Sequence, residues 1–579
     1  MNRLLTIVSS AAPDASDGAL RKLAEFLGLA VESVALAEMR SEGVTAMSGG
    51  ALAQLLAGNA TREAKLRRLP RGKLLVSGFS SGEELALLTE GVLVGVSAIP
   101  VGKRTYAYGE ELDRNEIPFA GLSRSFEEVR TLTVFVQAKP DARVVCLVSV
   151  EEQPLLVRVS VGATEVFLLA EGALPDLDAT CESSEALTAV TAALLPAAVF
   201  LRVALGAACW TNPFPAANLV IDDPTIRWRY GFVEFRRLLA EAVAHGYAVT
   251  IAFIPFNHRR SDRRTADFLR EHRERFSIAV HGCDHTGGEF GAMNAQRLLH
   301  ISRLGIERMQ SHERRSGMPF DPVMVFPQGF FSAPAFTALK RSGYEAVVNT
   351  ELWPKAAGER PRLAVRDLLG GATMGYAGFP LFSRRYPKSV FDFATDLFWG
   401  KPVLLVEHHG YFQNGYAHLA EFARQLNALR PRLAWKPLGE VVTGHALFRP
   451  LEAGRFAVKF FTPTLRLRNP TAAGATFALE KIETEADFVD HVTVDGRRAE
   501  FVVEGGVLRG EIPLPAAGEA LVKIIYRATP ATAYRLPLRY RYSAAARRYL
   551  SEFRDNHLAR HSRLLAVATK LKGLLRRGR

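Results

Sequence analysis

Cysteine is scarce in this chain, with 4 residues among 579, and no two of them have the C-x-x-C spacing. A zinc finger requires closely spaced cysteines, and a disulfide framework is indicated by several cysteines within a short chain, so the sequence indicates neither. Cys146, Cys181, Cys209 and Cys283 lie in separate segments, and we expect them to be reduced or simply buried.

Long hydrophobic runs are also missing. The most apolar window, residues 186–201, is uncharged over 16 positions, but it contains Pro196 and ends at Arg202. A bilayer span needs about 20 apolar residues, so this window predicts a buried helix. The apolar run at residues 4–8 is too short for a signal peptide and predicts a first strand. We therefore expect a cytoplasmic protein or one at the periphery of a membrane.

Acidic residues are scarce in the C-terminal part of the chain and common elsewhere. The formal net charge is +13, and residues 530–579 hold 13 of the 73 Lys and Arg but 2 of the 60 Asp and Glu. The other 60 basic and 58 acidic residues nearly cancel (73 − 13 and 60 − 2), so we expect no nucleic-acid partner. The basic tail is compatible with an anionic membrane, an anionic polymer or no specific partner.

Apolar side chains accompany the basic ones in this tail. Such a mixture permits peripheral binding to an anionic membrane. The residues concerned are Arg547, Arg548, Lys570, Lys572, Arg576 and Arg577, beside Leu564, Leu565, Leu571, Leu574 and Leu575.

The chain is too long for one core, and its patterns predict four parts. Residues 1–215 alternate strand and helix signals, which is typical of a doubly wound α/β domain. Residues 216–445 continue with βα units whose strands end in polar residues, as in barrel enzymes. Short alternating strands with turn pairs such as Asp495-Gly496 predict a small β-sandwich at 446–528, followed by a basic helical tail at 529–579.

Four polar motifs lie in the part expected to be a barrel. They are Asp222-Asp223, then His281 and His285, then the turn 326–330, and then His408-His409. An Asp pair before a proline is by itself an ordinary turn or helix start. The two histidines at 281 and 285 do not fit a metalloprotease helix, because an apolar strand pattern precedes them and Gly282 lies between them. Two acids and two histidines at strand ends together indicate a metal site.

In this order the motifs resemble those of the NodB-like polysaccharide deacetylases, of the carbohydrate esterase family 4 type. In that family they read Thr-Phe-Asp-Asp, His-Ser/Thr-x-x-His, Arg-x-Pro-x-Gly and Leu-x-Leu-His, on a distorted (β/α) barrel. The resemblance covers about residues 216–445. It implies a metal-dependent hydrolase that removes N-acetyl groups from amino sugars of a polysaccharide or glycoconjugate. The implied cofactor is a divalent metal, Zn²⁺ ahead of Co²⁺, Ni²⁺ or Mn²⁺.

The resemblance also implies a role for each matching residue. The general base would be Asp222, and the metal ligands would be Asp223, His281 and His285. The backbone amide of Gln328 would stabilise the oxyanion, inside a substrate-binding turn that includes Pro327 and Gly329. The acid that protonates the leaving amine would be His408 or His409.

Chemical reasoning agrees with these roles. A cation held by two imidazoles and one carboxylate keeps open positions for water and an acetyl oxygen, and a free carboxylate beside it can accept a proton. Neighbouring strand residues point to opposite faces, so only one of the two adjacent histidines faces the site. We favour His409 slightly, because an inward Glu407 on the same face would orient its imidazole.

Three departures from the family pattern favour an alternative. Val325 stands where the family has an arginine that braces the base, and Gly282 replaces the Ser or Thr of the second motif. The fourth-motif aspartates have no clear counterpart, since the expected region offers Asn349 and Glu351. The alternative is a non-catalytic saccharide-binding or assembly protein on a degenerate barrel.

Two further expectations concern the surroundings of the site. Trp228 and Tyr411 would suit stacking on a sugar ring. Residues 143–170 loosely resemble the strands that close a glutamine-amidotransferase-like domain. That part contains no Gly-x-Cys-x-Gly nucleophile elbow, because Cys146 lies within Val-Val-Cys-Leu-Val, so we expect a scaffold or binding module there.

Overall fold

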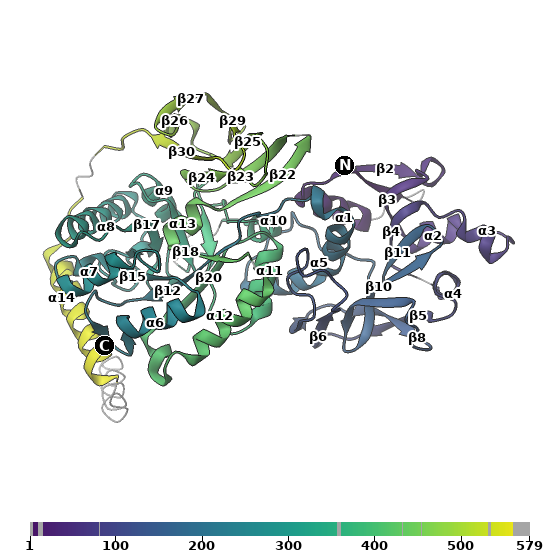
Figure 1. The fold of residues 1–579 in the computed structure, drawn as a ribbon, viewed down its shortest axis with the longest axis horizontal. Helices are drawn as coiled ribbons and strands as arrows, with labels where there is room; N and C mark the ends of the chain where they lie inside the picture. The colour runs from purple at the N-terminus through teal and green to yellow at the C-terminus, as the bar shows by residue number, and fades with distance from the viewer. Residues whose placement is uncertain are drawn as a thin grey trace.

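The computed structural model describes residues 4–9, 15–79, 81–355, 361–430, 432–452, 454–530 and 534–559. In Figure 1 an α/β part with the N-terminus lies on the right and a barrel lies on the left. Two β-sheets lie above the barrel, and one last helix runs along its left side (Figure 1). The mixed α/β class expected from the sequence is confirmed.

The first part is built on a nine-stranded sheet with the order β2-β1-β3-β4-β11-β10-β9-β6-β7. The strands from β2 to β11 in this order are parallel, which confirms the doubly wound pattern, and the rest are antiparallel. The strands are β1 (Leu4–Ser9), β2 (Ala30–Ala35), β3 (Glu42–Ser48), β4 (Arg71–Ser77), β6 (Gly102–Tyr108), β7 (Ser123–Glu128), β9 (Val144–Val150), β10 (Gln153–Val161) and β11 (Thr164–Leu169). A separate pair is formed by β5 (Leu93–Ile99) and β8 (Leu132–Gln137). The helices are α1 (Ala15–Phe26), α2 (Gly49–Leu55), α3 (Arg62–Leu66) and α4 (Glu83–Thr89).

Helix α5 (Ser184–Leu205) contains the most apolar window of the sequence. Among the described residues it is the one helix long and apolar enough to cross a membrane, and 72% of that window is buried inside the molecule. The expectation of a buried helix is confirmed.

The second part is a parallel barrel with the strand order β19-β18-β17-β16-β15-β12-β20. The barrel closes between its first and last strands, because Arg385 pairs in parallel with Leu405 and donates its N–H to the Leu404 carbonyl at 2.9 Å. The strands are β12 (Ala216–Asp222), β15 (Val249–Phe253), β16 (Phe276–His281), β17 (Asp321–Val325), β18 (Ala346–Asn349), β19 (Leu381–Ser383) and β20 (Val403–His408), with β21 (Ala434–Trp435) beside β12. The helices are α6 (Phe235–His245), α7 (Arg263–Glu271), α8 (Ala295–Ser316), α9 (Pro334–Lys340), α10 (Val365–Leu369), α11 (Val390–Phe398), α12 (Ala417–Leu429) and α13 (Leu438–Thr443).

Side chains alternate between the two faces of each barrel strand. The inner cluster of the barrel includes Val220, Ala279, Phe382 and Leu404. Their neighbours along the strands pack outward against the helices. Side chains of α13 join the inner cluster at the end of the barrel where the strands begin. The barrel is therefore filled at the amino ends of its strands, and a site can form only at their carboxyl ends.

Helix α6 begins at Phe235, and the chain between β12 and this helix contains two further short strands. The intervening residues form a short antiparallel pair, β13 (Arg229–Tyr230) and β14 (Val233–Glu234). Gly231 makes the turn between them with φ +54°, a conformation that glycine adopts without strain.

Two sheets form the expected β-sandwich, in the orders β22-β23-β25-β29-β28 and β24-β30-β26-β27. Apolar side chains of both sheets share one cluster, among them Val458, Phe477 and Val522. The strands are β22 (Ala446–Glu452), β23 (Arg455–Phe460), β24 (Thr464–Arg468), β25 (Ala475–Ile482), β26 (Val489–Val494), β27 (Arg497–Ala499), β28 (Phe501–Glu504), β29 (Val507–Leu514) and β30 (Glu519–Tyr526).

The last described element is α14 (Leu538–Phe553), which continues into a π-helical turn over Arg554–Leu558. A helix was predicted here, and it is confirmed over these residues. The predicted tail residues Leu564, Leu565, Lys570, Leu571, Lys572, Leu574, Leu575, Arg576 and Arg577 lie outside the described part of the chain.

Candidate metal centre

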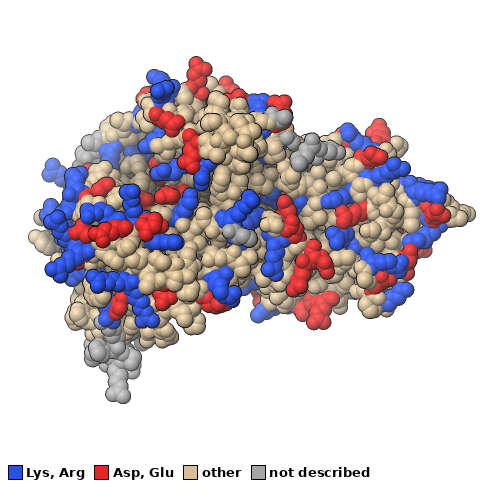
Figure 2. Space-filling model, viewed as in Figure 1, with Lys and Arg blue, Asp and Glu red and all other residues tan. Residues whose placement is uncertain are grey.

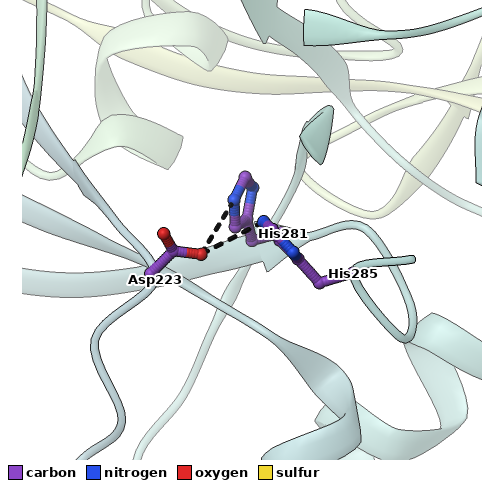
Figure 3. A group of neighbouring side chains, drawn as sticks. All are labelled: Asp223, His281 and His285. Atoms are coloured by element: carbon purple, nitrogen blue, oxygen red, sulfur yellow. Dashed lines mark ion pairs between the residues drawn. The ribbon is translucent and has the colours of Figure 1, made fainter. Parts of the chain in front are cut away.

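Asp223, His281 and His285 meet at the carboxyl ends of two neighbouring strands (Figure 3). Asp223 follows β12, His281 is the last residue of β16, and His285 lies in the loop after it. Their ligand atoms all lie within 4.8 Å of one another. Asp223 Oδ1 is 3.1 Å from His285 Nε2 and 3.6 Å from His281 Nε2. The structure thus brings the three predicted ligands together.

The two imidazoles of the cluster differ. Burial alone would lower the pKa of His285, but the neighbouring Asp223 carboxylate outweighs it and the pKa is raised. His281 Nδ1 lies 3.0 Å from the Val325 carbonyl and donates its hydrogen there, so the lone pair of Nε2 faces the cluster. Burial lowers the pKa of His281 to about 4 and keeps it neutral. Asp223 Oδ1 is buried and makes no hydrogen bond of good geometry with any described residue. A buried oxygen and two imidazole nitrogens that converge on one point match the donor set of Zn²⁺.

The backbone around the site is strained. Asp223 has φ +82°, His285 +54° and Gln328 +59°, which are left-handed values that side chains other than glycine rarely adopt. Each costs about 1–3 kcal/mol, and such residues concentrate at functional sites. Three of the predicted site residues are thus held in costly conformations by their surroundings.

Glu289 shapes the loop that carries His285. It is 2% exposed, and its carboxylate accepts hydrogen bonds from the N–H groups of Cys283 (2.8 Å), Asp284 (3.0 Å) and His285 (3.2 Å). A Cβ on Gly282 would lie 2.2 Å from Glu289 Oε1 and 2.5 Å from Pro327 Cγ. The glycine at position 282 therefore has a steric cause, because Glu289 and Pro327 fill the space that a side chain would need.

We expect the Glu289→Gln variant to bind the metal about 10–100-fold more weakly, because outer partners orient the ligands. The substituted amide side chain would present an NH2 group toward backbone N–H groups that need an acceptor. Competition with a chelator, followed by metal analysis, measures the change. Glu274→Gln, at an exposed carboxylate, is the control. Equal affinity in both variants would contradict the role of Glu289.

Asp222 lies inside the barrel beside the cluster and is paired with an arginine that the sequence reasoning missed. Arg384 Nη1 and Nη2 donate to its two carboxylate oxygens at 2.6 and 2.7 Å, and Asp222 is 3% exposed. Burial alone would raise the pKa of Asp222, but the charges of Arg384 and His281 outweigh it, and the pKa is lowered. Asp222 is therefore an ionised carboxylate that is not part of the metal cluster.

The arginine that pairs with Asp222 thus comes from the end of β19 and not from position 325. Val325 packs in the inner cluster of the barrel. One sequence signal could have identified Arg384. The pair Arg384-Arg385 follows a short apolar run at 380–382, and polar residues at the end of a barrel strand are typical of an active site.

The two adjacent histidines have different surroundings. His408 is the last residue of β20, shares the inner face with Leu404, and has Nε2 3.9 Å from Asp222 Oδ2. His409 begins the next helical turn, and its Nε2 is 3.6 Å from Asp555 Oδ1. The expectation of an inward Glu407 is wrong, because Glu407 shares the outward face with Leu405, where burial raises its pKa to about 7.

The site is open on the side of β19 and β20. The side chain of His408 is 47% exposed, and Tyr386, which the sequence reasoning missed, stacks against it with ring centroids 6.4 Å apart. Trp228 is 53% exposed and lies beside Arg236, whereas Tyr411 is half-buried and contacts Phe412. Gln328 is exposed in the turn after β17, and Pro327 and Gly329 beside it are buried.

On the opposite side, α14 covers the site. Tyr230 OH donates to Asp555 Oδ2 at 2.8 Å, and Arg260 donates to both oxygens of Glu552 at 2.6 Å. Arg548 is 2% exposed. Burial alone would raise the pKa of Asp223, but the interactions with His285, His281 and Arg548 outweigh it and hold the pKa well below its usual value. Helix α14 is thus one wall of the site, and no sequence motif predicted it.

No protein-family model matches the sequence, and no curated protein matches it. Solved structures of carbohydrate deacetylases are similar. One is the carbohydrate deacetylase Agd3, with 9% identity, 91% of this chain and 99% of that chain covered, and a TM-score of 0.43. A family 4 carbohydrate esterase from Streptomyces lividans in complex with acetate has 12% identity, 38% and 91% coverage and a TM-score of 0.24. A CE4 family pseudoenzyme from Bacillus anthracis has 10% identity, 40% and 67% coverage and a TM-score of 0.25.

Proposed function

We propose that this protein is a metal-dependent hydrolase that removes N-acetyl groups from amino sugars of a polysaccharide or glycoconjugate. The observation that carries the proposal is the buried, ionised Asp222 beside a three-residue cluster that fits a cation. Hydrolysis of an amide by water needs a base, a cation and an acid within one site. The site contains a candidate base, candidate ligands for the cation and a candidate acid.

Asp223, His281 and His285 would hold the metal, which when bound polarises the amide carbonyl and lowers the pKa of a water molecule. Asp222 accepts the proton of the attacking water, and Arg384 holds the Asp222 carboxylate in place. The backbone N–H of Gln328 donates to the developing oxyanion. His408, on the inner face beside Asp222, donates the proton to the leaving amine. Trp228, Tyr386 and Tyr411 offer rings to the sugar.

The roles of the other parts belong to the same proposal. Residues 1–215 act as a scaffold or binding module, 216–445 carry the reaction, 446–528 form the sandwich unit, and 529–579 form the basic tail. The likeness of the first part to glutamine amidotransferases remains a prediction.

One observation favours a second candidate, a non-catalytic saccharide-binding protein. Both oxygens of Asp222 accept hydrogen bonds from Arg384, which competes with acceptance of a proton from water. Such a protein would bind N-acetylglucosamine oligomers but would release no acetate from them.

We expect the Asp223→Ala, His281→Ala variant to lose the metal that the wild-type protein contains, because one ligand atom would remain. Elemental analysis after purification measures the metal, and acetate release from short N-acetylglucosamine oligomers measures activity. Asp267→Ala, His272→Ala removes the same residue types from α7 and its C-terminal end, and it should keep metal and activity.

The outcomes separate the candidates. Metal and acetate release in the wild type, both lost in the cluster variant, agree with the hydrolase. Metal with saccharide binding and no acetate favours the binding protein. Equal metal content in wild type and cluster variant rules out the metal site.

A further inference from the structure

Helix α14 has two faces of opposite character. Its inner face carries Ala544, Arg548 and Glu552, which are buried against the barrel. Its outer face exposes Leu538 (66%), Tyr542 (75%), Tyr549 (56%), Leu550 (70%) and Phe553 (55%). Single exposed apolar side chains are normal on a protein surface, but five on one helix of 16 residues form a patch.

The spacing aligns these side chains along the helix. Leu538, Tyr542, Tyr549 and Phe553 follow one another by 4, 7 and 4 positions, which keeps them on one stripe of an α-helix. At 1.5 Å per residue the stripe is about 22 Å long. Tyr549 packs against Arg260, whose guanidinium lies 4.4 Å from the ring centroid, so this ring also helps to attach α14. The polar attachment is made by Tyr230–Asp555 and Arg260–Glu552, and the side chains of Leu538, Tyr542 and Phe553 remain exposed.

The charge on this helix is one-sided as well. Its segment 538–558 contains two acids, and both are turned inward, with Glu552 6% and Asp555 3% exposed. Arg539, Arg541 and Arg547 are exposed, so the outward surface of α14 carries cations and apolar groups without an acid. Figure 2 draws Lys and Arg along the left edge of the molecule, where Figure 1 draws α14.

We propose that the outer face of α14 docks onto an anionic phospholipid surface. Aromatic and aliphatic side chains enter the boundary between headgroups and acyl chains, while arginines contact lipid phosphates. A second copy of the chain would place these arginines against one another, and an anionic polymer would leave the apolar stripe uncovered. Because the inner face of α14 borders the cluster of Asp223, His281 and His285, docking places this wall of the site beside the lipid and leaves the open side, at β19 and β20, accessible.

Sedimentation of the full-length protein with vesicles tests this proposal without requiring any activity. The wild type should pellet with vesicles of phosphatidylglycerol and phosphatidylcholine, at least about tenfold more than with phosphatidylcholine alone, and added salt should release it. The variant Leu538→Ser, Tyr542→Ser, Leu550→Ser should bind at least about tenfold more weakly, since each change removes apolar surface that would enter the lipid. Val101→Ser, Val129→Ser, Val502→Ser removes exposed apolar side chains elsewhere and should bind like the wild type.

Three results would overturn the proposal. The first is equal vesicle binding by the wild type and the α14 variant. The second is a dimer in sedimentation equilibrium that the α14 variant abolishes, with no vesicle binding, which would make the face a contact between copies. The third is salt-sensitive binding to heparin alone, which would assign the face to an anionic polymer. Circular dichroism of the α14 variant excludes loss of fold as the cause of weak binding.

Discussion

The Asp222→Asn variant should lose activity by about 10²–10⁴-fold in kcat/KM while it keeps its metal. Asparagine cannot accept the proton of the attacking water, and Asp222 is not one of the three clustered ligands. Steady-state acetate release and metal analysis of the same preparation measure the two effects. A large loss of activity at constant metal content separates the base from the metal ligands.

The chain offers a control in which a second buried aspartate loses its arginine partner. Arg385 donates to Asp396 at 2.7 and 3.1 Å, and Asp396 is 4% exposed, in the same fold but away from the cluster. Removing one partner of a buried pair costs about 3–5 kcal/mol in the free energy of unfolding. Both Asp→Asn variants should be destabilised, but Asp396→Asn by less than this, because the Arg385 side chain is 40% exposed. Only Asp222→Asn should lose activity. An equal loss of activity in Asp396→Asn would assign the effect to stability and not to a base.

Much of the fold could be predicted because the hydrophobic periodicity of helices and strands can be recognised in one sequence. The buried strands of the barrel, helix α5 and the short alternating strands of the sandwich all give strong local patterns. The antiparallel half of the first sheet was harder to predict in full. Strand β6, for example, mixes Lys103 and Arg104 with apolar residues, and which strands pair in a sheet is not a local property.

The meeting of Asp223, His281 and His285 could be predicted because these residues lie at strand ends within recognisable motifs. The partners of these residues could not. Arg384 reaches Asp222 across 162 positions of sequence, and Glu289 holds a loop through backbone groups that any residue provides. Helix α14 meets the site from 325 positions away, through Tyr230 and Asp555. Contacts of this kind form only when the barrel closes and when α14 packs against it. Local sequence patterns do not predict these events.

The choice between His408 and His409 shows how one register error changes a mechanism. An inward Glu407 was the reason to favour His409, and barrel alternation turns Glu407 outward and His408 inward. The strand also ends at His408, so His409 leaves the sheet and meets Phe232 and Asp555. The two imidazoles therefore differ in what they can reach, although they are adjacent in sequence.

We expect His408→Gln to lower kcat by about 10²–10⁴-fold with little change in KM, because the leaving amine loses its acid in the transition state. His409→Gln should keep a kcat near that of the wild type. Its thermal unfolding midpoint should fall, because the contact with Asp555 that helps to hold α14 is lost. Steady-state kinetics on N-acetylglucosamine oligomers and thermal denaturation of both variants provide the comparison. If kcat is lost in His409→Gln and kept in His408→Gln, the general acid is His409. Because His409 contacts Asp555, α14 would then have to move before the reaction.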